Sequence, residues 1–194
     1  MGELGQLFVT SSPTEEPITL TEAKLHLRVD HDDDDTLISS LITAARQYVE
    51  LSTRRALVTQ THQYVLEEFP CDDEIELIRP PVQSVTSIQY VDMAGNTQTF
   101  STDNWRFIAG EPGQVELKLN KFWPVAQPIG NAVTITYIAG YGAASAVPEI
   151  AKAAIKLYLG HLYENREAVT TGAMVKVPLA VDSIVSLLRW GDYR

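Results

Sequence analysis

Residues 34–52, DDTLISSLITAARQYVELS, contain the clearest helical pattern in this sequence. Apolar residues recur there every three or four positions, which predicts an α-helix. They form two adjacent stripes: Leu37, Leu41, Ala44, Tyr48 and Leu51, and beside them Ile38, Ile42, Ala45 and Val49. Together the stripes are wider than contact with a single layer requires. Two interpretations remain open: the helix is central to a bundle within one chain, or one stripe packs inside the subunit and the other against a neighbour.

Shorter helical patterns occur on both sides of this segment. Residues 19–27 combine threonine caps with an acidic first turn. Residues 148–165 begin with Pro-Glu, which suits a helix start. In residues 182–190 we expect Asp182 to be the N-cap, and the following glycine can end the helix.

Between these helical regions the pattern becomes that of β-structure. Residues 59–66, 85–91 and 133–137 alternate apolar and polar side chains and are rich in β-branched residues. Turn signals lie at 92–96 and 110–113. The sequence therefore predicts an α+β fold, in which N- and C-terminal segments build a helical bundle core and an antiparallel β domain is inserted. The expected boundaries are 1–57 and 143–194 for the core and 58–142 for the insertion.

Composition narrows the possible functions. The 194 residues are 45% hydrophobic and 21% charged, as in ordinary soluble globular proteins. With 15 basic and 25 acidic residues the net charge is −10, which disfavours a sequence-independent DNA binder. An acidic channel wall is compatible with this charge, because it would keep DNA from sticking. Cys71 is the only cysteine, so neither an intrachain disulfide nor a cysteine-based zinc cluster is possible. We expect no membrane segment and no secretory signal.

No motif predicts catalysis, a metal or a cofactor. The acidic run at 30–35 resembles a calcium loop, but Asp35 stands where the sharp turn needs glycine. Leu41 stands where a bidentate glutamate is required. The acids are better explained as a solvated cap for the helix that follows. The four histidines are scattered, and neither a phosphate-binding loop nor a nucleophile elbow is present. We therefore expect a protein that is not an enzyme.

Several short motifs, taken in order, are similar to phage head–tail connector proteins. They are turn, cap and packing residues, and their order along nearly the whole chain carries the resemblance. They comprise 18–29 (ITLTEAKLHLRV), Ala44-Ala45-Arg46 on the long helix, 80–85 (PPVQSV), 139–142 (AGYG), 147–150 (VPEI), 163–167 (YENRE) and the ending from Leu187-Leu188 to Tyr193-Arg194.

The resemblance implies a ring-forming adaptor, usually of twelve copies, that docks beneath the portal in the virion neck after assembly in the host cytoplasm. Its implied partners are further copies of itself, the portal protein, a neck or tail-completion protein, and genomic DNA that passes through the channel without sequence-specific binding. The β insertion is large for a simple connector, so its contacts stay undefined. The alternative is another virion assembly role, such as tail completion or a minor capsid component.

Two sets of residues are candidates for assembly contacts. Trp and Tyr with Arg are enriched in binding hot spots. We therefore expect the C-terminal segment to bind the portal through Leu187, Leu188, Trp190, Tyr193 and Arg194. Packing of Trp190 on its own bundle is the alternative. On the long helix we expect subunit contacts from Leu37, Leu41, Tyr48 and Arg46. For Arg46, with Arg54 and Arg55, the alternatives are a solvated face or ion pairs with the many acids, and a portal- or DNA-facing role.

Overall fold

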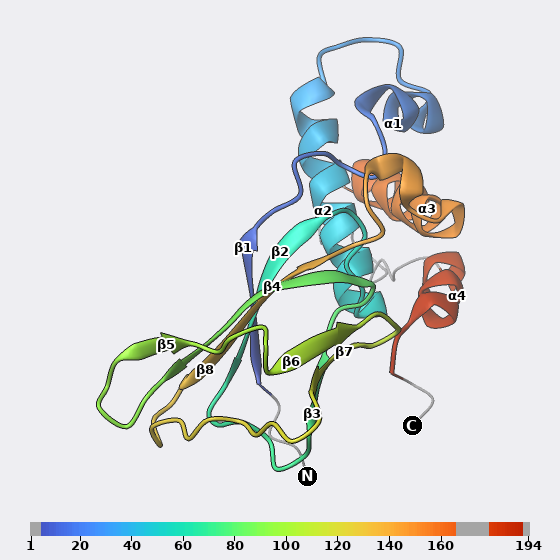
Figure 1. Ribbon diagram of the computed structural model, residues 1–194. Coiled ribbons are helices and arrows are strands. Elements are labelled where there is room, and N and C mark those ends of the chain that lie inside the picture. The colour runs from blue at the N-terminus through green and yellow to red at the C-terminus, as the bar shows by residue number, and fades with distance from the viewer. Residues whose placement is uncertain (1–4, 166–178, 192–194) are drawn as a thin grey trace. The chain divides into compact units, whose positions relative to one another are not determined.

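The computed structural model describes residues 5–165 and 179–191. Helices and antiparallel sheets are both present, so the predicted α+β class is confirmed (Figure 1). The chain divides into two compact units, each described here by itself. The β unit comprises residues 1–14 and 59–141, and the helical unit comprises residues 15–58 and 142–194.

The larger sheet of the β unit has five strands in the order β1-β2-β8-β4-β5, and all neighbours are antiparallel. Its central strand β8 alternates buried and half-buried residues, as expected for a strand with one face on the core. The strands are β1 (Gln6–Ser11), β2 (Gln60–Leu66), β4 (Val82–Val91), β5 (Thr97–Thr99) and β8 (Val133–Ala139). The three strands predicted from the sequence correspond to β2, β4 and β8.

A second, three-stranded sheet has the order β3-β7-β6. Its strands are β3 (Glu74–Leu77), β6 (Trp105–Ile108) and β7 (Gly113–Leu117). Ile75, Leu77 and Val115 are buried in this sheet, and Val115 pairs with Ile75 across the ladder. Gly113 is the first residue of β7. A Cβ at this position would lie 2.8 Å from the side chain of Val82, so no larger residue fits without a shift.

Strand β1 was not predicted, and it places the N-terminal residues in the β unit. The sequence predicts that residues 1–57 belong to the helical core, whereas β1 pairs antiparallel with β2 from Gln6 opposite Val65 to Val9 opposite His62. The segment is short and mostly exposed, so it lacks the alternating pattern that reveals a half-buried strand. That the β unit folds independently of the helical unit remains a proposal.

His62 is a buried titratable residue in the core of the larger sheet. Its exposed fraction is 2%, and neither ring nitrogen has a hydrogen-bond partner among the described residues. The ring meets Tyr137 of β8 edge-on, with centroids 5.4 Å apart. Burial first, and the positive charge of Arg79 second, lower the pKa of His62 to about 4. His62 therefore stays neutral near neutral pH.

The helical unit is organised around α2. The helices are α1 (Leu20–Leu27), α2 (Asp35–Thr53), α3 (Glu149–Glu164) and α4 (Leu179–Leu188), with a 3-10 turn η1 (Ala144–Ala146) before α3. The helices α1, α3 and α4 all contact α2, and Figure 1 shows them along one side of it. Of the helices in the described ranges, none is both long and apolar enough to cross a membrane.

A local signal in the sequence sets the start of α1, but the expected caps do not set the starts of α4 and α2. Thr19 and Glu22 form the predicted capping box: the Glu22 backbone N–H donates to Thr19 Oγ1 at 3.1 Å, and the Thr19 N–H donates to Glu22 Oε2 at 2.7 Å. The prediction for Asp182 was wrong, because α4 already includes Leu179 and Asp182 lies in its first turn. Asp34 precedes α2, but its carboxylate accepts a 2.6 Å hydrogen bond from Tyr163 instead of capping the helix backbone.

Candidate assembly surfaces

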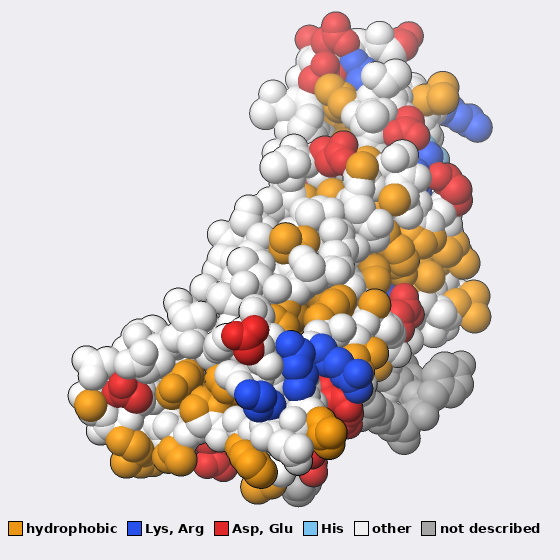
Figure 2. All heavy atoms as spheres, viewed as in Figure 1, with side chains coloured by type: hydrophobic (Ala, Val, Ile, Leu, Met, Phe, Trp, Pro, Cys, Tyr) orange, Lys and Arg blue, Asp and Glu red, His pale blue; other side chains and the backbone are white. Residues whose placement is uncertain are grey.

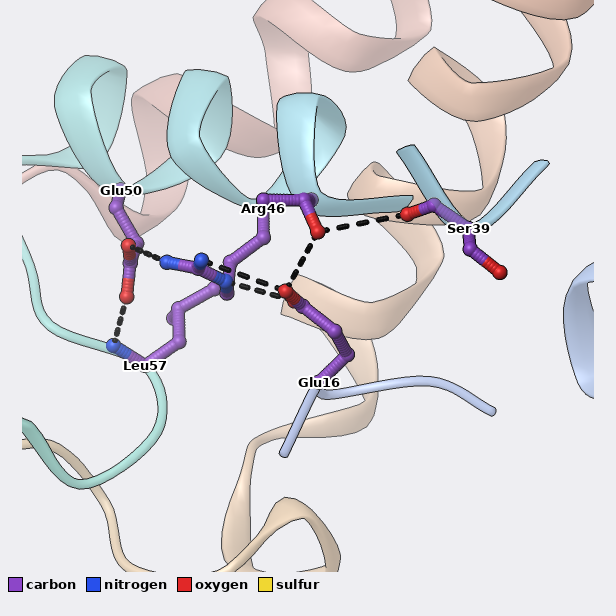
Figure 3. A network of polar contacts seen from close by, with 6 residues as sticks. Glu16, Ser39, Arg46, Glu50 and Leu57 are labelled. Atoms are coloured by element: carbon purple, nitrogen blue, oxygen red, sulfur yellow. Dashed lines mark hydrogen bonds and ion pairs between the residues drawn. The ribbon is translucent and has the colours of Figure 1, made fainter. Parts of the chain in front are cut away.

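A buried ion-pair network fixes the start of the helical unit to α2 (Figure 3). Arg46 Nε donates to Glu16 Oε2 and Arg46 Nη1 donates to Glu50 Oε2, each at 2.7 Å. Glu50 Oε1 in turn accepts the backbone N–H of Leu57 at 2.9 Å, and Glu16 Oε1 accepts from Thr43 Oγ1 at 2.8 Å. The side chains of Arg46 and Glu50 are 6% and 7% exposed. One guanidinium thus joins the segment before α1, the middle of α2 and the turn after α2.

The two glutamates of this network keep the Arg46 guanidinium charged although it is buried. Burial alone would lower its pKa, but the hydrogen bond to Glu16 and the charge of Glu50 outweigh burial and raise the pKa. The guanidinium is therefore held charged and already hydrogen-bonded within its own chain. It offers a neighbouring subunit almost no surface.

The two apolar stripes of α2 have different environments. Ile38, Ile42, Ala45 and Val49 are buried. In the other stripe Leu37, Leu41 and Tyr48 are half-buried, and Leu51 is exposed. Tyr48 stacks on Tyr158 of α3 with ring centroids 4.0 Å apart. One stripe thus fills the core, and the other leaves a partly exposed apolar strip that includes three of the four predicted contact residues.

The end of α4 is tied to the end of α2. Arg55 Nε donates to the carbonyl oxygen of Leu188 at 2.6 Å, and the backbone N–H of Trp190 donates to the carbonyl oxygen of Thr53 at 2.9 Å. Leu188 and Trp190 are half-buried, whereas the side chain of Leu187 is exposed. Tyr193 and Arg194, the other two predicted contact residues, lie outside the described residues. Leu187 is thus a protruding apolar side chain on a helix end that the chain itself holds in place.

Two carboxylates of the acidic run at 30–35 form ion pairs with a lysine of α1. Lys24 Nζ lies 2.5 Å from Asp32 Oδ1 and 2.7 Å from Asp35 Oδ1. Its hydrogen bonds to these two carboxylates raise the pKa of Lys24. Within residues 5–165 and 179–191, no group of three or more histidine, cysteine, aspartate or glutamate side chains is arranged to hold a metal ion.

We therefore expect melting curves in calcium, magnesium or EDTA to superimpose. An ion that binds the folded chain must raise its melting temperature. Differential scanning fluorimetry measures the melting temperature of the wild type and of Lys24→Met with and without each ion. The variant frees the carboxylates of Asp32 and Asp35 from the lysine without adding a metal ligand. A rise of several degrees with calcium in the wild type would contradict this reading of the acidic run.

The chain is similar to known proteins both in sequence and in fold. Residues 17–95 match the family model of phage gp6-like head-tail connector proteins. The fold is similar to a chain in the neck of an empty gene transfer agent particle computed with C6 symmetry, with a TM-score of 0.81, 26% identity and 97% of each chain covered. Both comparisons point to the phage head-tail connector family, to which the chain is similar. The resemblance stated from the sequence is confirmed.

Two further solved structures resemble this chain over 97% of both chains at 25% identity. One is from the virion of a native gene transfer agent particle, with a TM-score of 0.80. The other is from the neck of a native particle computed with C12 symmetry, with a TM-score of 0.78. No curated protein sequence matches this chain. Because the structural matches extend over almost the whole chain, they include both the helical and the β unit.

An apolar surface in the β unit was not predicted from the sequence. Between β7 and β8, four large hydrophobic side chains without regular secondary structure are exposed: Leu119, Phe122, Val125 and Ile129. The only sequence signal was a cluster of apolar residues in a segment with prolines, which is equally typical of a packed loop.

Proposed function

We propose that this connector is a non-enzymatic adaptor that joins the portal of a phage-type head to the neck or tail. The observation that carries the proposal is the match along 97% of the chain to proteins in the necks of gene transfer agent particles. An adaptor works by presenting surfaces to several partners at once. The two clearest on the helical unit are the partly exposed stripe of α2 and the end of α4.

The adaptor assembles as a ring, with twelve copies as the proposed number. The C6 and C12 symmetries of the similar neck structures support closed rotational assembly. The helical unit acts as a bundle core, and Leu37, Leu41 and Tyr48 pack against the neighbouring subunit. Arg46 is removed from this set, because its guanidinium is buried in the network with Glu16 and Glu50.

The C-terminal segment anchors each subunit to the portal. Leu187 supplies an exposed apolar side chain, and the hydrogen bonds of Arg55 and Trp190 hold the helix end in one orientation, which lowers the entropy lost on binding. Leu188, Trp190, Tyr193 and Arg194 complete the proposed contact. Genomic DNA passes through the ring without sequence-specific binding, and the net charge of −10 disfavours adhesion of the phosphate backbone.

Replacing Leu187 with aspartate is expected to abolish attachment to portal-bearing heads without lowering the melting temperature. Truncating a hot-spot side chain costs ~2 kcal/mol or more, which is roughly thirtyfold in affinity per subunit. Repeated around a ring, that loss also removes the avidity. Co-sedimentation with unfinished heads measures attachment, and circular dichroism measures melting.

Leu179→Asp is the matched control, because Leu179 is equally exposed at the other end of the same helix. It is expected to attach like the wild type. Attachment of Leu187→Asp at wild-type levels would rule out the C-terminal anchor. Absence of the wild-type chain from the necks of intact particles, probed with a specific antibody, would overturn the adaptor function itself.

A further inference from the structure

The two ends of α2 differ in charge. Five aspartates lie within residues 30–35, at the start of the helix. Figure 2 shows acidic side chains gathered at this end of the helical unit, where Figure 1 places the loop between α1 and α2. At the other end, Arg54 is the C-cap of α2 and Arg55 follows it. Cations are favourable there, because a helix C-terminus carries a partial negative charge. The helical unit therefore has an acidic end and a basic end.

The last turn of α4 extends the basic end. The backbone hydrogen bond from Trp190 to Thr53 joins the ends of the two helices. The guanidinium of Arg54 lies beside the residue that follows Trp190, because a Cβ added to the glycine there would be 3.5 Å from Arg54 Nη1. Leu187 and Arg189 are exposed just before it. The surface formed by Arg54, Leu187, Arg189 and Trp190 is called the arginine end.

The positive charge of the arginine end is not neutralised by nearby acids of the described chain. Arg54 is exposed and forms no hydrogen bond or ion pair with the residues that the structure describes. On α2 the closest acid in sequence is Glu50, which is buried in the ion-pair network. On α4 the acid is Asp182, in the first turn at the far end of the helix. Beyond residue 191 the sequence adds Asp192 and Arg194, whose charges cancel.

We propose that the arginine end binds an acidic surface of the portal, so that the C-terminal anchor is electrostatic as well as apolar. This inference rests on the proposed attachment of the C-terminal segment to the portal. A guanidinium group pairs with a carboxylate through two parallel hydrogen bonds. Arg and Trp are also the residues most enriched in binding hot spots. The partner that fits has carboxylates around an apolar pocket that receives Leu187.

A protein surface fits the arginine end better than the phosphate backbone of DNA does. Leu187 is 77% exposed on this surface. Phosphates are bound by charged and polar groups, so a protruding leucine adds nothing to such a contact. The basic residues within 50–58 and 182–191 are all arginines. Arginine is enriched and lysine depleted in protein–protein interfaces, whereas both residues bind phosphates.

Charge reversal tests the contact. Arg54→Glu is expected to weaken co-sedimentation with portal-bearing heads by roughly tenfold or more, because it sets a carboxylate against the acidic partner. Adding Arg189→Glu is expected to abolish attachment. Attachment of the wild type is expected to weaken as NaCl rises from ~50 to ~500 mM, because salt screens exposed charges.

Arg28→Glu is the matched control. Arg28 is an exposed arginine and the C-cap of α1, with a φ of 58° against 56° for Arg54. Both variants remove a favourable charge from a helix C-terminus, so circular dichroism should show similar changes in melting temperature. Arg28→Glu is nevertheless expected to attach like the wild type. Equal loss of attachment in the two variants would overturn the proposal.

Heads with and without packaged DNA separate the possible partners. Loss of Arg54→Glu attachment on DNA-filled heads alone would overturn the proposal and assign the arginine end to DNA. Wild-type attachment by the doubly reversed chain, with attachment still lost in Leu187→Asp, would also overturn it, while the apolar anchor and the adaptor function stand. Failure of the wild-type chain to attach to any head would refute the proposed anchor, and this contact with it.

Discussion

Replacing Arg46 with alanine is expected to lower the free energy of unfolding of the helical unit by about 3–5 kcal/mol. The change leaves the Glu50 carboxylate, 7% exposed, without its guanidinium partner. It also releases Glu16, so the segment before α1 loses its attachment to α2. Urea denaturation followed by far-ultraviolet circular dichroism measures the loss, because most of that signal comes from the helices.

Two further variants test whether the loss of stability comes from leaving a charge buried without its partner. Arg106→Ala breaks an ion pair with Glu116 in which the arginine side chain is 62% exposed, and it is expected to cost less than ~1 kcal/mol. Arg46→Met combined with Glu50→Gln removes both buried charges but keeps an acceptor for the Leu57 N–H, so it is expected to recover most of the loss. A small effect of Arg46→Ala would contradict the view that this network holds the helical unit together.

The elements that could be predicted from the sequence are those with strong local patterns. The two stripes of α2 gave its length, and the Thr19–Glu22 pair gave the start of α1. Strands β2, β4 and β8 were predictable because each has seven residues or more and contains β-branched and aromatic residues. Strands β3, β5 and β6 have three or four residues, which is too short for periodicity to show.

The missed features of the assembly surfaces depend on pairing between distant residues. No local pattern in Glu16 indicates that it meets an arginine thirty positions later, so the sequence left both a subunit contact and an ion pair within the chain open for Arg46. The exposure of Phe122 beside the anchored Trp123 depends on Phe69 and Asp72, which lie on another part of the chain. Leu187 was predicted as a contact residue because it lies beside Trp190, Tyr193 and Arg194, and its exposed side chain is compatible with that prediction.

Acidification from pH 6.5 to 4 is expected to destabilise the β unit by about 3 kcal/mol through His62 alone. The ordinary histidine pKa is 6.5, and burial followed by the charge of Arg79 lowers it to about 4 in the folded chain. In this window the unfolded chain binds a proton at this histidine that the folded chain does not. The free energy of unfolding is therefore unaffected by His62 above pH 6.5 and decreases as the pH falls toward 4. The size follows from ~1.4 kcal/mol for each unit of pKa difference.

His62→Leu isolates this effect, because the carboxylates that titrate in the same range are common to both proteins. Leucine has no nitrogen to desolvate, so we expect it to be more stable than histidine at neutral pH and to lose less stability on acidification. Urea denaturation at several pH values, followed by tryptophan fluorescence, gives the comparison: Trp105 and Trp123 both belong to the β unit. His31→Leu is the control for loss of a histidine elsewhere, since His31 is half exposed and belongs to the helical unit. Equal pH dependence in the wild type and His62→Leu would show that His62 is hydrogen-bonded or solvated in the folded chain.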